Sequence, residues 1–401
     1  MPTNDRRLDP NAPLPGPPDP WAETEMPSRR DGPPWHMTEM IEAEPALSQR
    51  ILDRLAADGS ARQLAQVARQ HADAGHPVLF VGCGTSEHGA LAAAAVIGEA
   101  LDAVAVPAAS VQAFEASLMP MHGGGLVVGI SHEGGTWATI QALEHARAAG
   151  MTTALITASR RTAAAQRADI VLETLEIDQS WCHTVGYLSP IVAAVEVAAV
   201  FDDRSDVAPD VRPVLAAGLE AGAVAAAEAA ATTLAALDRV VVVAGGTDQI
   251  AARELVLKIE EGTHLPAAFR QTETLLHGHL AGMDDRTGVA VIAAEPLEAA
   301  ARASRLANAL RAALELGIRP TAILTAPYAA SIPDELTPGG RIVINAVARN
   351  VGHAAQALLA TAVPLQLLTE RMARVRGVNP DPIRRDDPRY LAAAAAGSPT
   401  S

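Results

Sequence analysis

A recurring unit of strand, turn and helix constrains the fold of this chain more than any other feature. A short apolar run, a glycine-containing turn and an alanine-rich segment follow one another at residues 76–101, and the same succession returns at 124–150. Two further apolar runs follow at 152–157 and 168–174. Runs of this length are typical of buried strands, and the segments between them have helical spacing. Such units in series predict a parallel sheet with helices on its faces, an α/β fold.

The same pattern starts again in the second half, with apolar runs at 239–246 and 287–296 and a helix-spaced segment at 247–262 between them. Two α/β halves of ordinary domain size are therefore expected. In chain order we expect a disordered Pro-rich arm over 1–36, a first domain over 37–205, a connecting helix over 206–237, a second domain over 238–376 and a C-terminal tail over 377–401.

Charge and cysteine usage narrow the classes of partner. The 31 basic residues face 46 acidic ones, a formal charge of −15, which makes nucleic acid and anionic membrane surfaces poor partners. Cys83 and Cys182 are the only cysteines, too few for a disulfide scaffold or a thiolate zinc site. The sequence shows neither an uninterrupted apolar stretch of membrane-spanning length nor the apolar core of a signal peptide, so we expect a cytoplasmic protein.

Two turns carry residues that favour an anionic ligand. Thr85 and Ser86 follow the first apolar run and open a helix, and Ser131 and Thr136 do the same after the next one. A helix N-terminus presents free N–H groups to an anion of phosphate size, although hydroxyl residues are also ordinary helix caps. Turns at the carboxyl ends of neighbouring parallel strands are where open α/β folds bind ligands. We therefore expect a binding site at these two turns.

Several motifs together resemble a known family. They are GCGTS at 82–86, S-x-x-G-x-T at 131–136, ELVLKIEE at 254–261, LLHGHL at 275–280, VPLQLL at 363–368 and PRYLA at 388–392. The chain is similar to proteins with two sugar isomerase (SIS) domains, such as the isomerase half of glutamine:fructose-6-phosphate amidotransferase, stand-alone phosphosugar isomerases and hexosamine-6-phosphate deaminases. The resemblance implies two SIS domains, each a parallel sheet flanked by helices in a flavodoxin-like, three-layer arrangement.

The resemblance also implies roles for individual residues. The family's sugar-phosphate-binding positions correspond to Thr85, Ser86, Ser131, His132 and Thr136. Its proton-transfer glutamate and the lysine three residues before it correspond to Glu261 and Lys258. The histidine implicated in ring opening, which is donated across a dimer, corresponds to His277. The resemblance thus implies a homodimer that acts on a small sugar phosphate.

The residues themselves support a catalytic role for this helix. Glu254, Lys258 and Glu261 are spaced i, i+4 and i+7, so they share one helical face. A partly desolvated carboxylate suits the transfer of a proton between neighbouring carbons, and an ammonium group stabilises a developing oxyanion. A solvated ion pair is the alternative interpretation. Against it, Lys258 is the only lysine beside thirty arginines, and it falls at the family's lysine position.

Three departures from the family pattern qualify the expected chemistry. The chain opens with Met1-Pro2 rather than the nucleophilic cysteine of a glutaminase domain, so we expect no glutamine hydrolysis. Ala393 stands where the family has a lysine that forms a Schiff base with the ketose. Glu133 replaces a hydroxyl residue in the second turn, where its carboxylate would repel a phosphate.

The loop 179–187 occupies the place of the family's substrate loop and carries Trp181 and His183. We count His183 and Glu133 among the candidate substrate contacts. Trp181 is a candidate sugar platform or a packing anchor. We expect no metal and no organic cofactor, because the family uses none. The expected activity is phosphosugar isomerisation or hexosamine-6-phosphate deamination by proton transfer between C1 and C2. The alternative is a sensor that binds a sugar phosphate without turnover.

Overall fold

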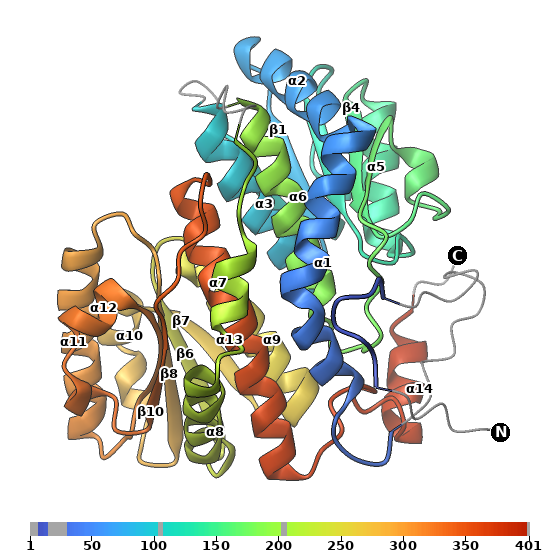
Figure 1. Cartoon of the computed structure of the whole chain (residues 1–401). Helices are drawn as coiled ribbons and strands as arrows, with labels where there is room; N and C mark the ends of the chain where they lie inside the picture. The colour runs from blue at the N-terminus through green and yellow to red at the C-terminus, as the bar shows by residue number, and fades with distance from the viewer. Residues whose placement is uncertain (1–6, 15–29, 103–106, 202–206, 399–401) are drawn as a thin grey trace.

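The computed structural model describes residues 7–14, 30–102, 107–201 and 207–398, and within them the chain forms two parallel five-stranded sheets (Figure 1). The first sheet has the order β2 (Ala109–Gln112), β1 (Val78–Gly82), β3 (Leu126–Ile130), β4 (Thr152–Thr157) and β5 (Ile170–Glu173). The second has the order β7 (Ala267–Gln271), β6 (Arg239–Ala244), β8 (Thr287–Ala293), β9 (Thr321–Thr325) and β10 (Gly340–Ile344). The two orders are the same, which confirms the predicted α/β fold with two similar halves.

Helices form three layers around these sheets. A central layer lies between the two sheets and contains α1 (His36–Asp58), α2 (Ser60–Asp73), α3 (Thr85–Leu101), α6 (Val185–Phe201), α8 (Ala221–Ala235), α9 (Asp248–Thr263) and α13 (His353–Arg376) (Figure 1). The outer layer of the first half contains α4 (Ala113–Leu118) and α5 (Trp137–Ala148). That of the second half contains α10 (Thr272–Leu276), α11 (Ala299–Glu315) and α12 (Ala326–Ser331). Short 3₁₀ turns lie at η1 (Ala165–Arg167), η2 (His279–Gly282) and η3 (Asp334–Leu336).

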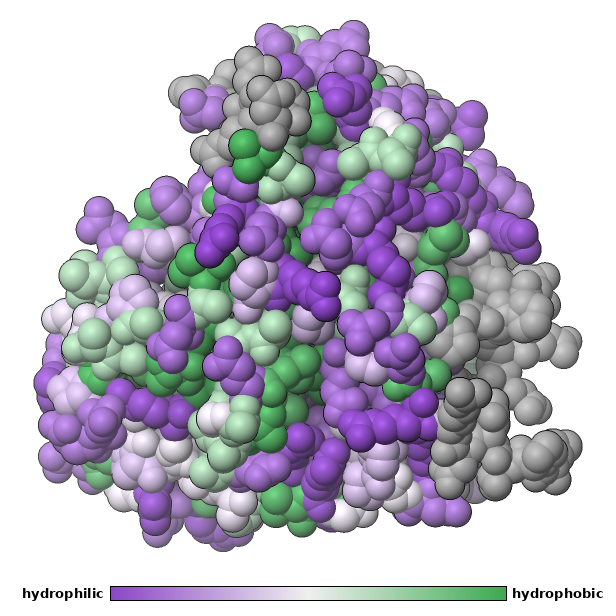
Figure 2. Space-filling model, in the orientation of Figure 1, coloured by the Kyte–Doolittle hydropathy of each residue, from purple (hydrophilic) through white to green (hydrophobic). Residues whose placement is uncertain are grey.

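The cores follow from the alternation of side chains along the strands. Phe80 of β1 and Val242 of β6 belong to the same central core, so the helices between the sheets serve both halves. Val81 points to the opposite face and packs in the outer core of the first half. Hydrophilic side chains dominate the surface over α1 and α2 (Figure 2). Among the described helices, none combines the length and apolar character needed to cross a membrane.

The segment that joins the halves differs from the single helix expected over 206–237. It contains α7 (Arg212–Ala217) and α8, separated by three residues. Gly218 lies against α13 so closely that a Cβ there would be 2.6 Å from the Val363 side chain. Glu220 is then extended, with φ −62° and ψ 148°, before α8 begins. The alanine content of this segment favours a continuous helix. Close packing on α13 nevertheless interrupts the helix and changes the direction of the chain.

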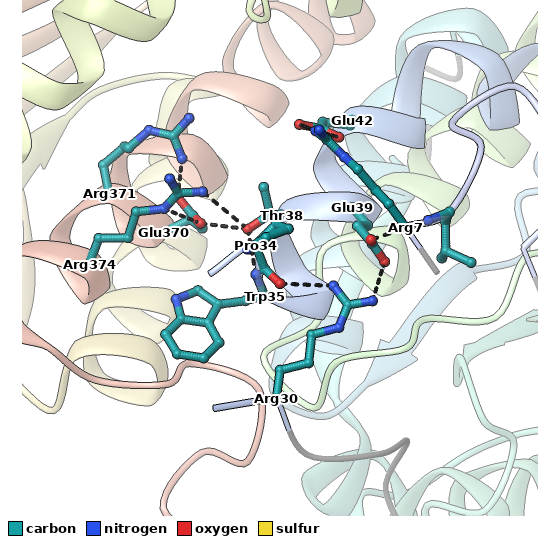
Figure 3. A network of polar contacts seen from close by, with 11 residues as sticks. Arg7, Arg30, Pro34, Trp35, Thr38, Glu39, Glu42, Glu370, Arg371 and Arg374 are labelled. Atoms are coloured by element: carbon teal, nitrogen blue, oxygen red, sulfur yellow. Dashed lines mark hydrogen bonds and ion pairs between the residues drawn. The ribbon is translucent and has the colours of Figure 1, made fainter. Parts of the chain in front are cut away.

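The described parts of the expected disordered arm, residues 7–14 and 30–36, contact the folded chain, and His36 already begins α1, whereas 1–6 and 15–29 lie outside the described residues. The Leu14 amide donates to Glu176 at 3.2 Å, and its side chain is buried. Arg30 forms an ion pair of 2.7 Å with Glu39 of α1 (Figure 3). A composition rich in proline and charge does not reveal these partners, because the contact of Leu14 spans 162 residues and that of Arg30 depends on how the arm folds back on α1.

The start of α1 is held from the second half. Thr38 donates to Glu370 of α13 at 2.6 Å, and Arg374 pairs with the same carboxylate at 2.7 Å (Figure 3). Asp381, in the tail, accepts hydrogen bonds from the backbone amides of His36 and Met37 at 3.0 and 2.9 Å. The tail beyond it ends in α14 (Pro388–Ala396), which has no buried residue. The tail therefore reaches back to the first half before it becomes exposed.

Candidate active site

The first turn places Thr85 and Ser86 at the carboxyl end of β1. A Cβ on Gly82 would lie 2.2 Å from the backbone oxygen of Ser86, and Gly84 has a φ of +57°, so this wrapped turn requires both glycines. The Thr85 hydroxyl is buried and donates to Oε1 of Glu254 at 3.3 Å. The half-buried Ser86 hydroxyl has no hydrogen-bond partner among the described residues.

The second turn follows β3, which is the direct neighbour of β1 in the sheet. Ser131 is buried and donates to the Thr136 hydroxyl at 3.3 Å. Gly134 has a φ of +66°, and a Cβ there would lie 2.2 Å from the Thr162 hydroxyl oxygen. The two hydroxyl-rich turns therefore lie at the same edge of the sheet, at the point where the strand order reverses direction.

His132 and His183 lie together beside the second turn. Their ring centroids are 5.5 Å apart, and Nε2 of His132 accepts a hydrogen bond of 3.0 Å from the Asp178 amide. Burial and the neighbouring His183 lower the pKa of His132 to about 4, and burial and Lys258 lower the pKa of His183 to about 3. Both imidazoles are therefore neutral at pH 7. Glu133 is half exposed, with its carboxylate 3.7 Å from Nε2 of His183.

Asp178 organises the loop that carries His183, a role that sequence reasoning missed. Its carboxylate accepts hydrogen bonds from the backbone amides of Ser180, Thr184 and Gly186 at 3.1, 2.7 and 3.1 Å. A lone aspartate before a loop is a common turn residue, so its spacing alone gave no signal.

Glu254, Lys258 and Glu261 share the face of α9 that the sequence predicted. Nζ of Lys258 lies 2.6 Å from Oε2 of Glu261 and 3.5 Å from Oε1 of Glu254. The side chains of Lys258 and Glu254 are 0% exposed, and that of Glu261 is 22% exposed. The structure therefore excludes a solvated ion pair for these three residues.

The three groups differ in how their surroundings shift their pKa values. Burial opposes the charge on Lys258, but the carboxylates of Glu261 and Glu254 outweigh burial and raise the pKa of the ammonium. Burial also opposes the charge on Glu254, but Lys258 and His88 outweigh it and lower the pKa of that carboxyl. For Glu261 burial prevails over Lys258, so its pKa is raised. Glu261 is thus the more basic of the two carboxylates and the one nearer to solvent.

Glu254 links this helix to the first turn. Its Oε2 lies 2.6 Å from Nδ1 of His88, and its Oε1 accepts the hydrogen bond from Thr85. His88 was not among the predicted residues. It lies three residues after Thr85 and so on the same face of α3, a spacing that the sequence already contains. The carboxylate therefore joins the first turn of the first half to the lysine of the second.

His277 and Ala393 lie outside this cluster. His277 follows α10, has a side chain that is 76% exposed, and pairs with Glu273 at 3.2 Å. Ala393 lies on the exposed α14. Trp181 packs under the Arg385 guanidinium, whose carbon is 4.7 Å from the ring centroid. Within the described ranges, no three His, Cys, Asp or Glu side chains are placed to hold a metal ion.

Comparison with known proteins identifies the fold that carries these turns. The family model for the SIS domain matches residues 72–201, which include β1, both turns and the loop around His183. The chain therefore contains a SIS domain over these residues. Its second sheet repeats the SIS strand order, so the molecule contains two SIS-type domains.

A curated relative of this SIS protein is the isomerizing glutamine–fructose-6-phosphate aminotransferase of Zymomonas mobilis subsp. mobilis, 25% identical over 342 residues. The match covers 79% of the chain, and the chain spans about half (51%) of that relative.

Solved structures share the fold at low sequence identity. The C-terminal domain of glucosamine-fructose-6-phosphate aminotransferase from Francisella tularensis has a TM-score of 0.72 at 19% identity, covering 87% of this chain and 98% of that one. Tagatose-6-phosphate ketose/aldose isomerase from Escherichia coli has a TM-score of 0.67 at 18% identity, covering 87% and 95%. Glucosamine-6-phosphate deaminase from Thermotoga maritima has a TM-score of 0.59 at 17% identity, covering 86% and 97%.

Proposed function

We propose that this SIS protein is an enzyme that isomerises a sugar phosphate, or deaminates a hexosamine 6-phosphate, by proton transfer between C1 and C2. The observation that carries the proposal is the ion pair of Lys258 and Glu261 on α9, in which a carboxylate of raised pKa lies 2.6 Å from a buried ammonium. A base that removes a proton from carbon and returns it to the next carbon needs a pKa near the working pH.

The two turns of the first half bind the phosphate in this proposal. The Ser86 hydroxyl lacks a described partner, and the Ser131 and Thr136 hydroxyls pair only with each other, so all three can turn to an anion. His132 and His183 are neutral and add no charge to the site. Glu133 lies at the same turn, and its carboxylate repels a phosphate dianion there. The site therefore favours ligands whose phosphate lies on the side of Ser86.

The proposed reaction moves one proton twice. Glu261 removes the proton from C2 of the open-chain aldose, and the electron pair shifts toward the C1 oxygen, where Lys258 stabilises the developing negative charge. A proton then passes from the C2 hydroxyl to the C1 oxygen, and Glu261 returns the proton it removed to C1, which leaves a C2 ketone and a C1 hydroxyl, that is, a ketose. When C2 carries an amine, the same transfer gives a C2 imine, and water hydrolyses it to the ketose and ammonia.

The experiment is an assay of hexosamine and hexulose phosphates, with ammonia release and ketose formation as the readouts. Glu261→Gln keeps the shape of the side chain and removes the base, so turnover should fall by about 100-fold or more while the dissociation constant changes little. Glu260→Gln is the matched control, because Glu260 is the adjacent, exposed carboxylate of α9. Deuterium from solvent should enter C1 or C2 with the native protein and with the control only.

Ala393 favours a second candidate, a sensor that binds the sugar phosphate without turnover, because the alanine cannot form an imine with a ketose. A sensor would bind the sugar phosphate and show no deuterium exchange. Glu261→Gln would then change affinity alone, and that result would replace the enzyme proposal.

We further propose a homodimer in which His277 serves the partner's site. Its side chain is 76% exposed, as a residue donated to a partner must be in a single chain. Glu261→Gln and His277→Ala variants should each be inactive, and mixing and reassembling them should restore about a quarter of native activity, since each mixed dimer retains one intact site. Absence of restored activity in a mixture that has exchanged subunits would place His277 outside the partner's site.

A further inference from the structure

The second sheet has a pocket of its own, outside the site described above. It has a volume of about 260 Å³ and lies at the carboxyl ends of β6 and β8. These strands occupy the positions that β1 and β3 occupy in the first sheet. The pocket is therefore at the second point of the molecule where the strand order reverses, which is the place where open α/β sheets bind ligands. Its polar lining includes Asp248, Gln271, Arg302 and Arg305.

Arg302 supplies an unpaired positive charge to this pocket. Its Nε donates to the Leu297 carbonyl at 2.9 Å, and no described carboxylate lies within ion-pairing distance of the guanidinium. A Cβ on Gly246 would lie 2.7 Å from Nη1, so the glycine leaves room for the guanidinium against the turn that precedes α9. Arg305, by contrast, is neutralised by Glu273, with two contacts of 2.5 and 2.7 Å. Of these two arginines, Arg302 is therefore the one whose positive charge is available to a ligand.

Asp248 supplies an unpaired polar atom. The residue is 2% exposed, and its Oδ2 accepts hydrogen bonds from the amides of Ala294 and Glu295 at 2.9 and 3.0 Å. Its Oδ1 has no partner within the described part of the chain. Burial raises the pKa of this carboxyl to about 7, although the two amides oppose the shift. A buried polar atom without a partner is uncommon in native proteins, and a bound molecule is one way to satisfy it.

A backbone amide at the start of α9 already has a hydrogen-bond acceptor within the protein. Oε2 of Glu295 accepts a hydrogen bond from the Thr247 amide at 3.2 Å. Around Ser86, in the corresponding turn of the first sheet, no carboxylate of the described residues makes such a contact with the backbone. An anion in the second pocket must therefore be held by Arg302 rather than by the helix N-terminus.

We propose that this pocket is a second small-molecule site, which binds the phosphate monoester of a small polyol through Arg302, with a ligand hydroxyl on Asp248. A guanidinium group suits a phosphate because it offers parallel donors. The volume lies just below the usual range of about 300–1,000 Å³ for ligand pockets, which fits a molecule of monosaccharide size. The proposal does not depend on catalysis at Glu261.

Calorimetry with glucitol 6-phosphate tests this proposal, because the probe lacks a carbonyl and cannot turn over. The native protein should bind two molecules per chain, and Arg302→Ala should weaken one of the two sites at least tenfold, which corresponds to about 1.4 kcal/mol. Arg302→Gln should have the same effect with less change in packing. Arg311→Ala is the matched control, since Arg311 lies on the same helix and outside the pocket. Unphosphorylated glucitol should not bind at the second site.

Variants of the first turn separate this proposal from the proposed function. Ser86→Ala combined with Ser131→Ala should weaken only the first site. A single native site that this double variant removes and that Arg302→Ala leaves intact would overturn the second site and leave the proposed function standing. A single site that depends on Arg302 alone would support the pocket and contradict phosphate binding at the first turn. Absence of any binding would reject both.

Discussion

Removal of the buried ammonium of Lys258 should destabilise the protein in a pH-dependent way. Lys258→Met keeps the apolar length of the side chain and leaves Glu254, which is fully buried, with His88 and Thr85 as its polar partners among the described residues. Breaking a buried ion pair on one side costs about 3–5 kcal/mol, because a buried charge stays uncompensated. We expect a loss of this size in the free energy of unfolding at pH 8.

The pH dependence follows from Glu254. In the native protein Lys258 is the main group that lowers the pKa of Glu254 against burial. Without the ammonium, burial should raise this folded-state pKa above the unfolded value, so the folded variant binds a proton more tightly than the unfolded chain. Its stability is then greatest at low pH and falls as the pH rises through the folded-state pKa. The difference from native protein should therefore be smaller at pH 5 than at pH 8.

Urea unfolding followed by circular dichroism, at pH 5 and pH 8, measures both quantities. The double variant Lys258→Met with Glu254→Gln removes the stranded charge, so it should recover much of the stability and lose the added pH dependence. A loss below about 1 kcal/mol for Lys258→Met at pH 8, or a loss equal at both pH values, would refute the assignment of Lys258 as the counter-ion that Glu254 requires.

Three further predictions concern the first-half turns. Ser86→Ala should weaken sugar-phosphate binding by about 1 kcal/mol or more in calorimetry, as loss of a hydrogen bond to a charged group does, and unchanged affinity would remove this turn from the site. Glu133→Ser should tighten binding of the same ligand, whereas weaker binding would show that the carboxylate contacts it favourably. His132→Gln retains an acceptor for the Asp178 amide and removes the imidazole. Because the folded-state pKa of His132 is about 4 against 6.5, this histidine alone should cost the native protein about 3 kcal/mol of stability as the pH falls through this interval, and the variant should lose less than the native protein in urea unfolding.

The sequence predicted the parts of the fold that depend on neighbours along the chain. Apolar runs and the glycine turns are local, and a parallel sheet brings the turns after β1 and β3 to one edge whatever the later chain does. The helical face of Glu254, Lys258 and Glu261 was predictable for the same reason, since it depends only on spacing within α9. The burial of that face was not, because it depends on distant segments that pack on α9, among them α3 and α13.

Contacts between distant segments were the parts that sequence reasoning missed. His88 lies on a predicted helix, but its partner Glu254 is 166 residues away. The break between α7 and α8 depends on the close approach of Gly218 to Val363, which composition does not encode. The described arm residues bind α1 and Glu176 through single ion pairs and amides, whereas their proline and charge content is typical of unstructured chain.

The capping of α1 by Asp381 has a consequence for synthesis on the ribosome. His36 and Asp381 are 345 residues apart, so at about 5–20 residues per second the amides at the start of α1 wait roughly 17–70 s for their acceptor to be translated. During that interval α1 also lacks α13, against which it packs in the finished protein. The first half therefore cannot complete its packing until the end of the chain has been translated. In nascent chains that stall before residue 381, the start of α1 should stay uncapped and exposed. We expect chaperones to bind at this place.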